Sequence, residues 1–117
     1  MISIIDWKSV VDIVRTHKCQ TRVKVTGWDE SDWSATIFIP ALGCLELPAT
    51  GPVEVSKIEY LDIRVRYEKK LGKFAKPQVC DQGKEVMGKL SSLQVGCRLI
   101  EDSSIIRIET THRLLGK

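Results

Sequence analysis

The sequence predicts an α+β domain in which a single antiparallel sheet of about five to six strands carries two helices packed on one face. Apolar residues recur at helical spacing in two segments, near residues 7–14 and 86–93, and alternate with polar residues in much of the chain between and after them. The 117 residues, 43% of them hydrophobic and 28% charged, fit one globular domain spanning residues 1–117.

The first helix is predicted from about residue 6 to residue 18. Asp6 can cap its first turn, because a carboxylate accepts hydrogen bonds from the unpaired amides there. Four apolar residues follow at the spacing of one helical face: Trp7, Val10, Val11 and Val14. This face is expected to pack on the sheet.

Three short strands are expected to follow. Residues 21–27 alternate valine with basic residues, as a half-buried strand does. Residues 34–40 place apolar side chains at alternate positions until Pro40 stops the strand, and residues 43–48 form a third. Residues 28–33 are predicted to be a loop.

Residues 53–70 are the longest β-like stretch. Every second residue is apolar over residues 61–67, but the apolar residues at 58 and 60 have the opposite parity. Because a one-residue slip would turn the apolar face outward, a bulge or bend is expected near residues 56–57. A basic loop over residues 71–77 follows.

The last part of the chain predicts a helix and two strands. Asp81 could cap the helix, whose apolar face carries Val86, Leu90 and Leu93 at positions i, i+4 and i+7. Residues 97–111 then have the pattern of a β-hairpin. The order is therefore helix, three or four strands, helix, two strands.

The sequence contains no complete catalytic signature, and we expect a protein without enzymatic activity, cofactor or metal. Phosphate-binding loops, dinucleotide-binding glycines, zinc-protease motifs and nucleophile elbows are all missing from it. Glu68 and Lys70 match half of a metal-dependent nuclease motif. Asp62 would lie about 20 Å from Glu68 on one straight strand at roughly 3.3 Å per residue, too far to share an ion. Another acid, such as Glu46 or Glu54, could take the place of Asp62, but nothing in the sequence selects one. The four cysteines are expected to be free thiols, packed as small hydrophobic side chains.

Positive charge is concentrated in the second half of the chain. Residues 1–60 carry six Lys and Arg against eight Asp and Glu, and residues 61–117 carry twelve against seven, for a net charge of +3. Most of the excess lies in the basic segment, residues 64–76, with Arg64, Arg66, Lys69, Lys70, Lys73 and Lys76. These side chains suit phosphate groups, so nucleic-acid binding is one interpretation. A solvated sheet face with a charged edge that discourages aggregation is the other.

Two of the three tryptophans flank a cluster of carboxylates in the acidic tryptophan loop, residues 28–33. Its candidate binding residues are Trp28, Asp29, Glu30, Asp32 and Trp33. One interpretation places the rings in the core and leaves the acids solvated. The other is a protein interface, because buried tryptophans dominate binding hot spots and clustered acids steer association with a basic partner.

The first sixty residues resemble a group of small bacterial proteins. The resemblance lies in the opening helix with Trp7, the Arg22-Val-Lys strand, residues 33–40, and Gly51-Pro-Val-Glu-Val with the following residues 58–63. Some proteins of this kind are immunity proteins of contact-dependent inhibition and related polymorphic toxin systems. The resemblance implies a binding protein that neutralises a cognate toxin domain by covering its active site or an exosite.

A cytoplasmic location is expected. No apolar run approaches the roughly 20 residues that cross a bilayer, so no membrane partner is expected. The opening residues lack a basic region, and Asp6 and Asp12 would interrupt the apolar part of a secretory signal.

Overall fold

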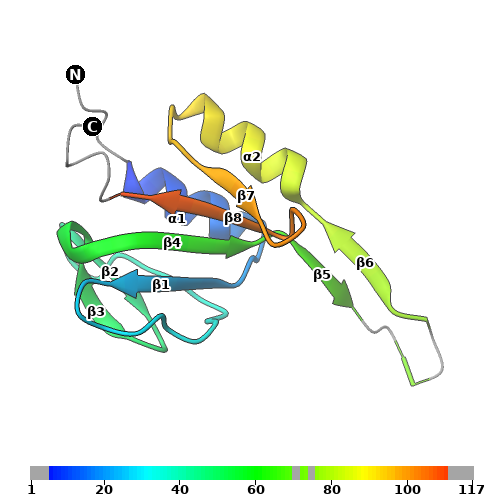
Figure 1. Cartoon of the computed structure of the whole chain (residues 1–117), viewed down its shortest axis with the longest axis horizontal. Helices are drawn as coiled ribbons and strands as arrows, with labels where there is room; N and C mark the ends of the chain where they lie inside the picture. The colour runs from blue at the N-terminus through cyan, green and yellow to red at the C-terminus, as the bar shows by residue number, and fades with distance from the viewer. Residues whose placement is uncertain (1–5, 70–71, 74–75, 111–117) are drawn as a thin grey trace.

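The computed structural model describes residues 6–69, 72–73 and 76–110. The predicted α+β class is confirmed: two helices, α1 (Trp7–Thr16) and α2 (Gly83–Ser92), accompany an antiparallel sheet (Figure 1). Within the described residues this main sheet has four strands rather than the predicted five to six. The other four strands form two separate two-stranded sheets.

The main sheet has the strand order β1-β4-β8-β7, with every neighbouring pair antiparallel. The strands are β1 (Thr21–Val25), β4 (Ile58–Arg64), β8 (Ile105–Glu109) and β7 (Arg98–Ile100). Val23, Leu61 and Ile108 lie directly across from one another and are fully buried. Alternation along each strand therefore directs one apolar face toward the helices and one polar face away from them.

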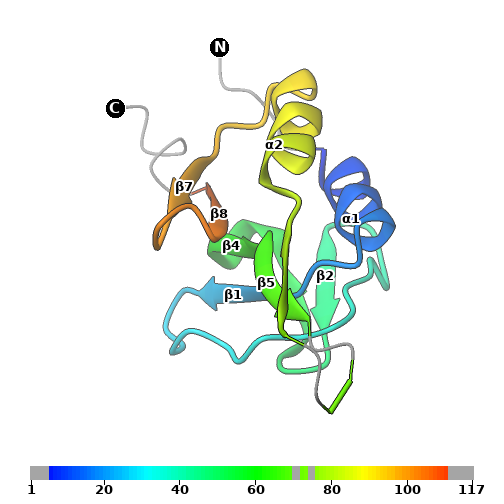
Figure 2. The same cartoon turned by 90° about the vertical axis from the view of Figure 1, so that its right-hand side faces the viewer.

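Both helices lie on the same side of the main sheet (Figure 2). Asp6 caps α1 as predicted, since its carboxylate accepts a hydrogen bond from the Ser9 amide at 3.2 Å. The buried side chains of the helices are Val10, Val11 and Val14 of α1 with Val86 and Leu90 of α2, and they join the same core as the inner sheet face. Gln82 occupies the N-cap position of α2 but makes no capping hydrogen bond with its side chain, whereas the Asp81 carboxylate accepts a hydrogen bond from the Gly83 amide at 2.9 Å.

The predicted strand over residues 34–40 is wrong. Only two isolated bridges form there, from Ser34 to Thr21 of β1 and from Phe38 to Glu46 of β2 (Cys44–Leu47). Because the two ends of the segment pair with different sheets, no continuous ladder can run through it. The β2 strand pairs instead with β3 (Gly51–Glu54).

The expected break near residues 56–57 is confirmed. A short 3-10 helix, η1 (Val55–Lys57), separates β3 from β4 at the point where the apolar parity changes. The long stretch is also interrupted at Val65, between β4 and a further strand over Arg66–Lys69. Val65 is fully buried there, and the amides of Val65 and Arg66 both donate to the Ser104 carbonyl.

A two-stranded hairpin, the arm, projects from the body of the molecule (Figure 1). It consists of β5 (Arg66–Lys69) and β6 (Gln78–Asp81), paired antiparallel. The sequence did not predict β6. The described side chains of β6 are exposed or half-buried, and Val79 is 54% exposed. The arm therefore has little core of its own.

Candidate functional site

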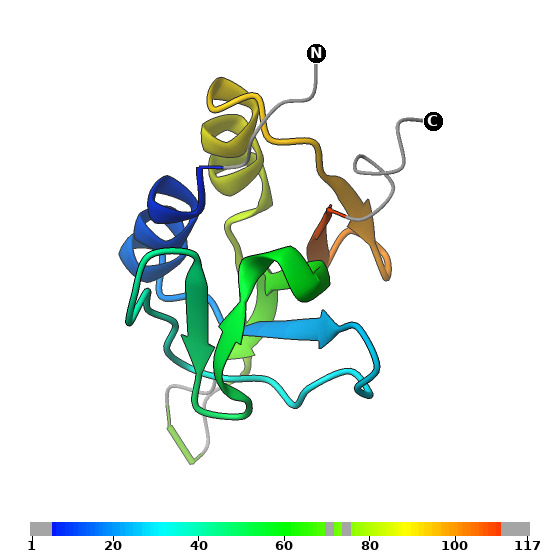
Figure 3. The same cartoon turned by 90° about the vertical axis from the view of Figure 1, so that its left-hand side faces the viewer.

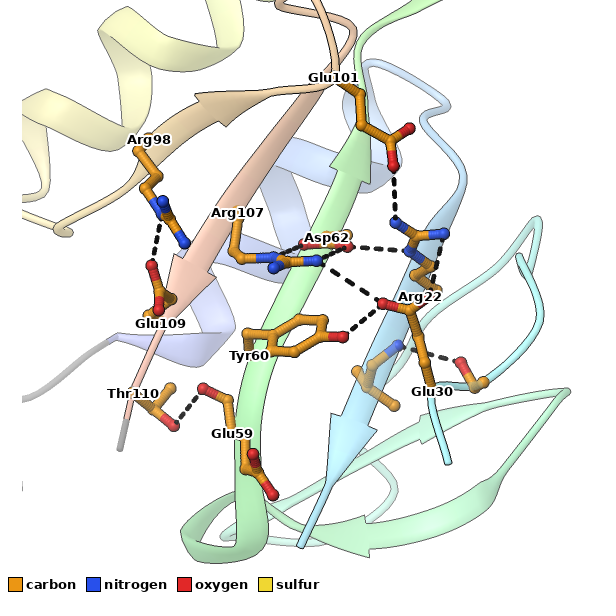
Figure 4. Close-up of polar contacts among 12 residues, drawn as sticks. Arg22, Glu30, Glu59, Tyr60, Asp62, Arg98, Glu101, Arg107, Glu109 and Thr110 are labelled. Atoms are coloured by element: carbon orange, nitrogen blue, oxygen red, sulfur yellow. Dashed lines mark hydrogen bonds and ion pairs between the residues drawn. The ribbon is translucent and has the colours of Figure 1, made fainter. Parts of the chain in front are cut away.

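A row of charged side chains crosses the face of the main sheet that points away from the helices. Arg22, Asp62, Arg107 and Arg98 lie side by side on β1, β4, β8 and β7. Figure 4 shows the first three of these groups meeting over the middle of the sheet. Their positions follow from strand alternation, which sends these residues to one face and the core residues to the other.

Asp62 is fully buried at the centre of this row. Its Oδ2 accepts hydrogen bonds from Arg22 Nε at 2.9 Å and Arg107 Nη2 at 3.0 Å, and its Oδ1 accepts from Arg107 Nε at 2.8 Å. These hydrogen bonds raise the pKa of Arg107 above its ordinary value. A buried carboxylate normally requires such paired and hydrogen-bonded partners.

Glu30 joins the acidic tryptophan loop to this charged row. Its carboxylate lies 3.1 Å from Arg22 Nη1 and 3.6 Å from Arg107 Nη2, and it accepts a hydrogen bond from the Tyr60 hydroxyl. The Arg107 guanidinium also lies over the Tyr60 ring, 3.8 Å from its centroid. Burial, together with the bond to Glu30, raises the pKa of Tyr60 to about 12. Glu30 therefore attaches the loop to three strands of the sheet, through Arg22 of β1, Tyr60 of β4 and Arg107 of β8.

The backbone of the loop runs back along the free edge of β1 (Figure 3). Thr21 and Ser34 exchange two backbone hydrogen bonds, at 3.0 and 2.8 Å. The Val23 carbonyl accepts a hydrogen bond from the Ser31 amide at 2.9 Å, and the Val23 amide donates one to Ser31 Oγ at 3.0 Å. The Trp28 amide donates to the Val25 carbonyl. These bonds fix the loop and cover an edge that could otherwise pair with another chain.

Trp33 lies neither in the core nor in open solvent. Its half-buried ring is covered by two guanidinium groups, that of Arg22 at 4.5 Å from the centroid and that of Arg64 at 4.2 Å. Arg64 is held in place by a 2.7 Å hydrogen bond to Gln20 Oε1. The ring therefore stacks against two charged side chains, which anchor the end of the loop.

The rest of the loop faces outward. Trp28 is 51% exposed, and Asp29 and Asp32 are exposed as well. Within the described part of the chain, neither of these two carboxylates forms an ion pair. The loop thus presents one exposed indole ring and two carboxylates without an ion-pair partner among the described residues, on a fixed backbone.

The structure separates the residues of the basic segment into two places. Arg64 ends β4 in the body of the molecule, whereas Arg66 and Lys69 lie on β5 of the arm. Lys73 and Lys76 are exposed, and Lys70 lies outside the described residues. No single row contains all six predicted positions, because the chain changes sheets at Val65.

The geometry does not support the nuclease interpretation. Both oxygens of Asp62 are occupied by guanidinium groups, and Glu68 lies on the arm in a different sheet. Among the residues that the structure describes, no group of three His, Cys, Asp or Glu side chains could hold a metal ion. No helix among them is long and apolar enough to span a membrane.

The contacts of His17 and Cys19 indicate that these residues support the fold. His17 Nδ1 lies 2.8 Å from Gln82 Oε1 and its Nε2 lies 2.9 Å from Lys89 Nζ, so the imidazole connects the end of α1 to α2. All four cysteines are free thiols, but only Cys19 is buried. Burial raises its pKa to about 11, which disfavours the reactive thiolate.

Sequence reasoning did not identify the residues that hold the loop. Strand alternation placed Arg22 and Asp62 on a polar face, but it does not say which residues face each other across strands. That depends on register, and the partners Tyr60 and Arg107 follow from it. Comparison of the chain with family models, with curated proteins and with solved structures gave no match.

Proposed function

We propose that this chain is a non-enzymatic binding protein that acts as an immunity protein, neutralising a cognate toxin domain by covering its active site or a neighbouring exosite. The observation that carries the proposal is the display of three exposed side chains, Trp28, Asp29 and Asp32, on a fixed loop. Glu30 and Trp33 hold the loop from beneath through Arg22, Arg107 and Arg64.

A preformed loop favours tight binding. Ordering a mobile segment on association reduces affinity, whereas this loop is ordered by its contacts with β1, β4 and β8 before any partner arrives. Trp28 would insert into the partner as an anchor, because tryptophans are enriched among the residues that dominate interface energetics. Asp29 and Asp32 would steer a basic partner toward the surface.

The toxin as partner rests on the resemblance of the first sixty residues to small bacterial immunity proteins. We place the encounter in the cytoplasm, where a protein of this kind would meet an incoming toxin domain. An interface of about 1,600 Å² would suffice for stable inhibition.

The experiment uses the toxin domain encoded immediately upstream of this gene and measures association and dissociation on a biosensor. Asp29→Lys with Asp32→Lys should slow association at least tenfold at low salt, because steering acts mainly on the association rate. Trp28→Ala should instead speed dissociation, with a loss of about 2 kcal/mol or more. The matched control is Asp12→Lys with Glu54→Lys, two exposed acids elsewhere. Equal association rates for the two double variants, or no upstream toxin gene across several genomes, would contradict the proposal.

A second candidate function is nucleic-acid binding through the basic segment. The projecting arm supports it, because two-stranded ribbons are one of the elements that enter the grooves of nucleic acids. A gel-shift assay at low salt tests it. Retention of no DNA or RNA even at tens of millimolar salt would reject it, since phosphate contacts are strongest there.

A further inference from the structure

A groove runs across the body between the end of α1 and residues 35–38. It consists of two adjoining hollows of about 460 and 380 Å³, which share Lys18 and Ala35 in their walls. The larger hollow extends to Arg64 and the root of the arm, and the smaller one extends to Arg15 and Phe38. The groove is separate from the exposed residues of the acidic tryptophan loop.

Three cations line this groove along its length: Arg15, Lys18 and Arg64. None of them has a carboxylate partner among the described residues, whereas Arg22 and Arg107 on the sheet face are both paired. Lys18 follows α1 with a φ of +54°, and a hydrogen bond from the Lys18 amide to the Arg15 carbonyl fixes this turn. The positive charge of the groove is therefore held on a rigid backbone.

The walls of the groove also offer aromatic rings and free backbone groups. Phe38 is 38% exposed in the smaller hollow, and Tyr67 is half-buried in the larger one. Residues 35–37 lie between the two isolated bridges and form no backbone hydrogen bond with the described part of the chain. Ile37 is buried, but Ala35 and Thr36 are exposed, so the amides and carbonyls of these two residues remain available to a ligand.

We propose that this groove binds single-stranded nucleic acid. Grooves for single strands combine cations that track the phosphate backbone with aromatic side chains on which bases stack, and this groove has both. Phosphates would lie against Arg15, Lys18 and Arg64, and bases against Phe38 and Tyr67. Hollows of this size admit single nucleotides, whereas a duplex would contact only their rim. Among the described lining residues Glu68, at the arm end, is the one carboxylate, and it would mark the end of the phosphate path.

This inference deepens the second candidate function and does not rest on the toxin proposal. It moves the nucleic-acid site from the exposed arm into the body of the molecule. Two of the three proposed phosphate contacts, Arg15 and Lys18, lie outside the basic segment.

The test measures fluorescence anisotropy of labelled oligothymidylate and oligouridylate of about 12 nucleotides, within the range of single-strand sites. Lys18→Gln with Arg64→Gln should weaken binding at least tenfold at about 50 mM salt. The same change should reduce the slope of log K against log salt by about 1.4, because each lost contact on a single strand is worth about 0.7. Comparing the affinities for oligothymidylate and oligouridylate shows whether the groove prefers single-stranded DNA or RNA.

Two matched controls carry the same loss of charge. Lys57→Gln with Lys84→Gln alters exposed residues outside the groove lining, and Arg66→Gln with Lys76→Gln alters β5 of the arm and the connection that leads to β6. Each should change the affinity less than threefold. If the arm variant weakens binding and the groove variant does not, the inference is wrong while the second candidate function stands.

Two further variants keep the test independent of Arg64, which also stacks on Trp33. Arg15→Gln with Lys18→Gln should again weaken binding at least tenfold, and Phe38→Ala should weaken it about fivefold or more through lost stacking. Thermal unfolding of each variant checks that the fold persists. Competition by polyglutamate equal to that by unlabelled oligonucleotide would identify an acidic-peptide groove, and equal binding of a duplex of the same length would identify general phosphate attraction. Either result would overturn the inference.

Discussion

Asp62 shows how a single residue can be assigned to the right face of a strand and still be misjudged. Alternation along β4 predicts a polar, outward-facing position, and the residue is indeed on that face. It is nevertheless fully buried, because Arg22 and Arg107 from the two neighbouring strands extend over it. Long arginine side chains can cover a short carboxylate in this way, and only the cross-strand register shows that they do.

Replacement of Asp62 tests the importance of this charge. Asp62→Asn should lower the free energy of unfolding by about 2 kcal/mol, because two guanidinium groups lose their shared carboxylate and one amide NH₂ would face a donor. The value is below that for a wholly buried pair, since the arginine side chains are 15% and 20% exposed. Urea unfolding measures the change. Asp12→Asn on the exposed face of α1 is the control and should shift stability by less than about 0.5 kcal/mol.

Cys19 should make stability depend on alkaline pH. Burial raises the pKa of this thiol from 9.0 to about 11, so between these values the folded protein binds a proton that the unfolded chain has lost. The stabilisation is therefore complete below pH 9 and decreases as the pH rises toward 11, by about 2 kcal/mol. Urea unfolding at pH 8.5 and pH 10.5 should show a smaller decrease for Cys19→Ala than for the unaltered protein. Equal decreases would show that the thiol does not carry the effect.

At the scale of elements, the acidic tryptophan loop was predicted as a loop, but the roles of its two rings were not resolved by sequence. The structure gives Trp28 and Trp33 different environments, because Trp28 is exposed and Trp33 is stacked against Arg22 and Arg64. The scarcity of tryptophan drew attention to both rings equally. The difference between the two rings depends on contacts of Trp33 with Arg22 of β1 and Arg64 of β4. Nothing in the local sequence of the loop indicates these contacts.

The two tryptophans should respond differently to truncation. Trp33→Ala should lower the free energy of unfolding by about 1–2 kcal/mol, because two cation–π contacts and part of the covered surface are lost. Trp28→Ala should change it by less than about 0.5 kcal/mol, since half of that side chain is already in solvent. Thermal or urea unfolding measures both. A large loss with Trp28→Ala would place that ring in the structural framework rather than on a binding surface.

Elements governed by local signals were predicted well, and elements governed by pairing were not. The α1 helix begins and ends within two residues of the prediction, because its capping residue and its apolar face can both be recognised from the local sequence. The segment 34–40 has a strand-like pattern but meets two different sheets, so it forms only bridges. The β6 strand, with four residues and no alternating burial, could be recognised only through its partner β5.

At the scale of the whole molecule, Arg64 connects the two surfaces that we assign to binding. Its guanidinium stacks on Trp33 beneath the acidic tryptophan loop, and its side chain also lines the groove beside Lys18. A phosphate bound at Arg64 would compete with this stacking. The loop and the groove are therefore neighbours that share one side chain, although they carry opposite charge.

The arm gives the molecule its elongated shape, with a longest extent of 51 Å against 28 and 22 Å in the other directions (Figure 1). Among the described residues, the root of the arm is joined to the body beside buried Val65, by hydrogen bonds from the amides of residues 65 and 66 to Ser104 and from the Gln82 amide to Val65. A two-stranded ribbon with exposed faces contributes little to the stability of a domain.

Removing most of the arm should therefore leave the body folded. Replacement of residues 68–79 by Asn-Gly retains Tyr67 and Cys80, which are paired across the ribbon, and joins them by a two-residue turn that suits a hairpin. The thermal midpoint should change by less than about 4 °C, which corresponds to roughly 1 kcal/mol for a domain of this size. Asp62→Asn in the same shortened chain should still cost about 2 kcal/mol, because distant sites act independently. A loss of cooperative unfolding in the shortened chain would show that the arm supports the core, and the division into body and arm would then be wrong.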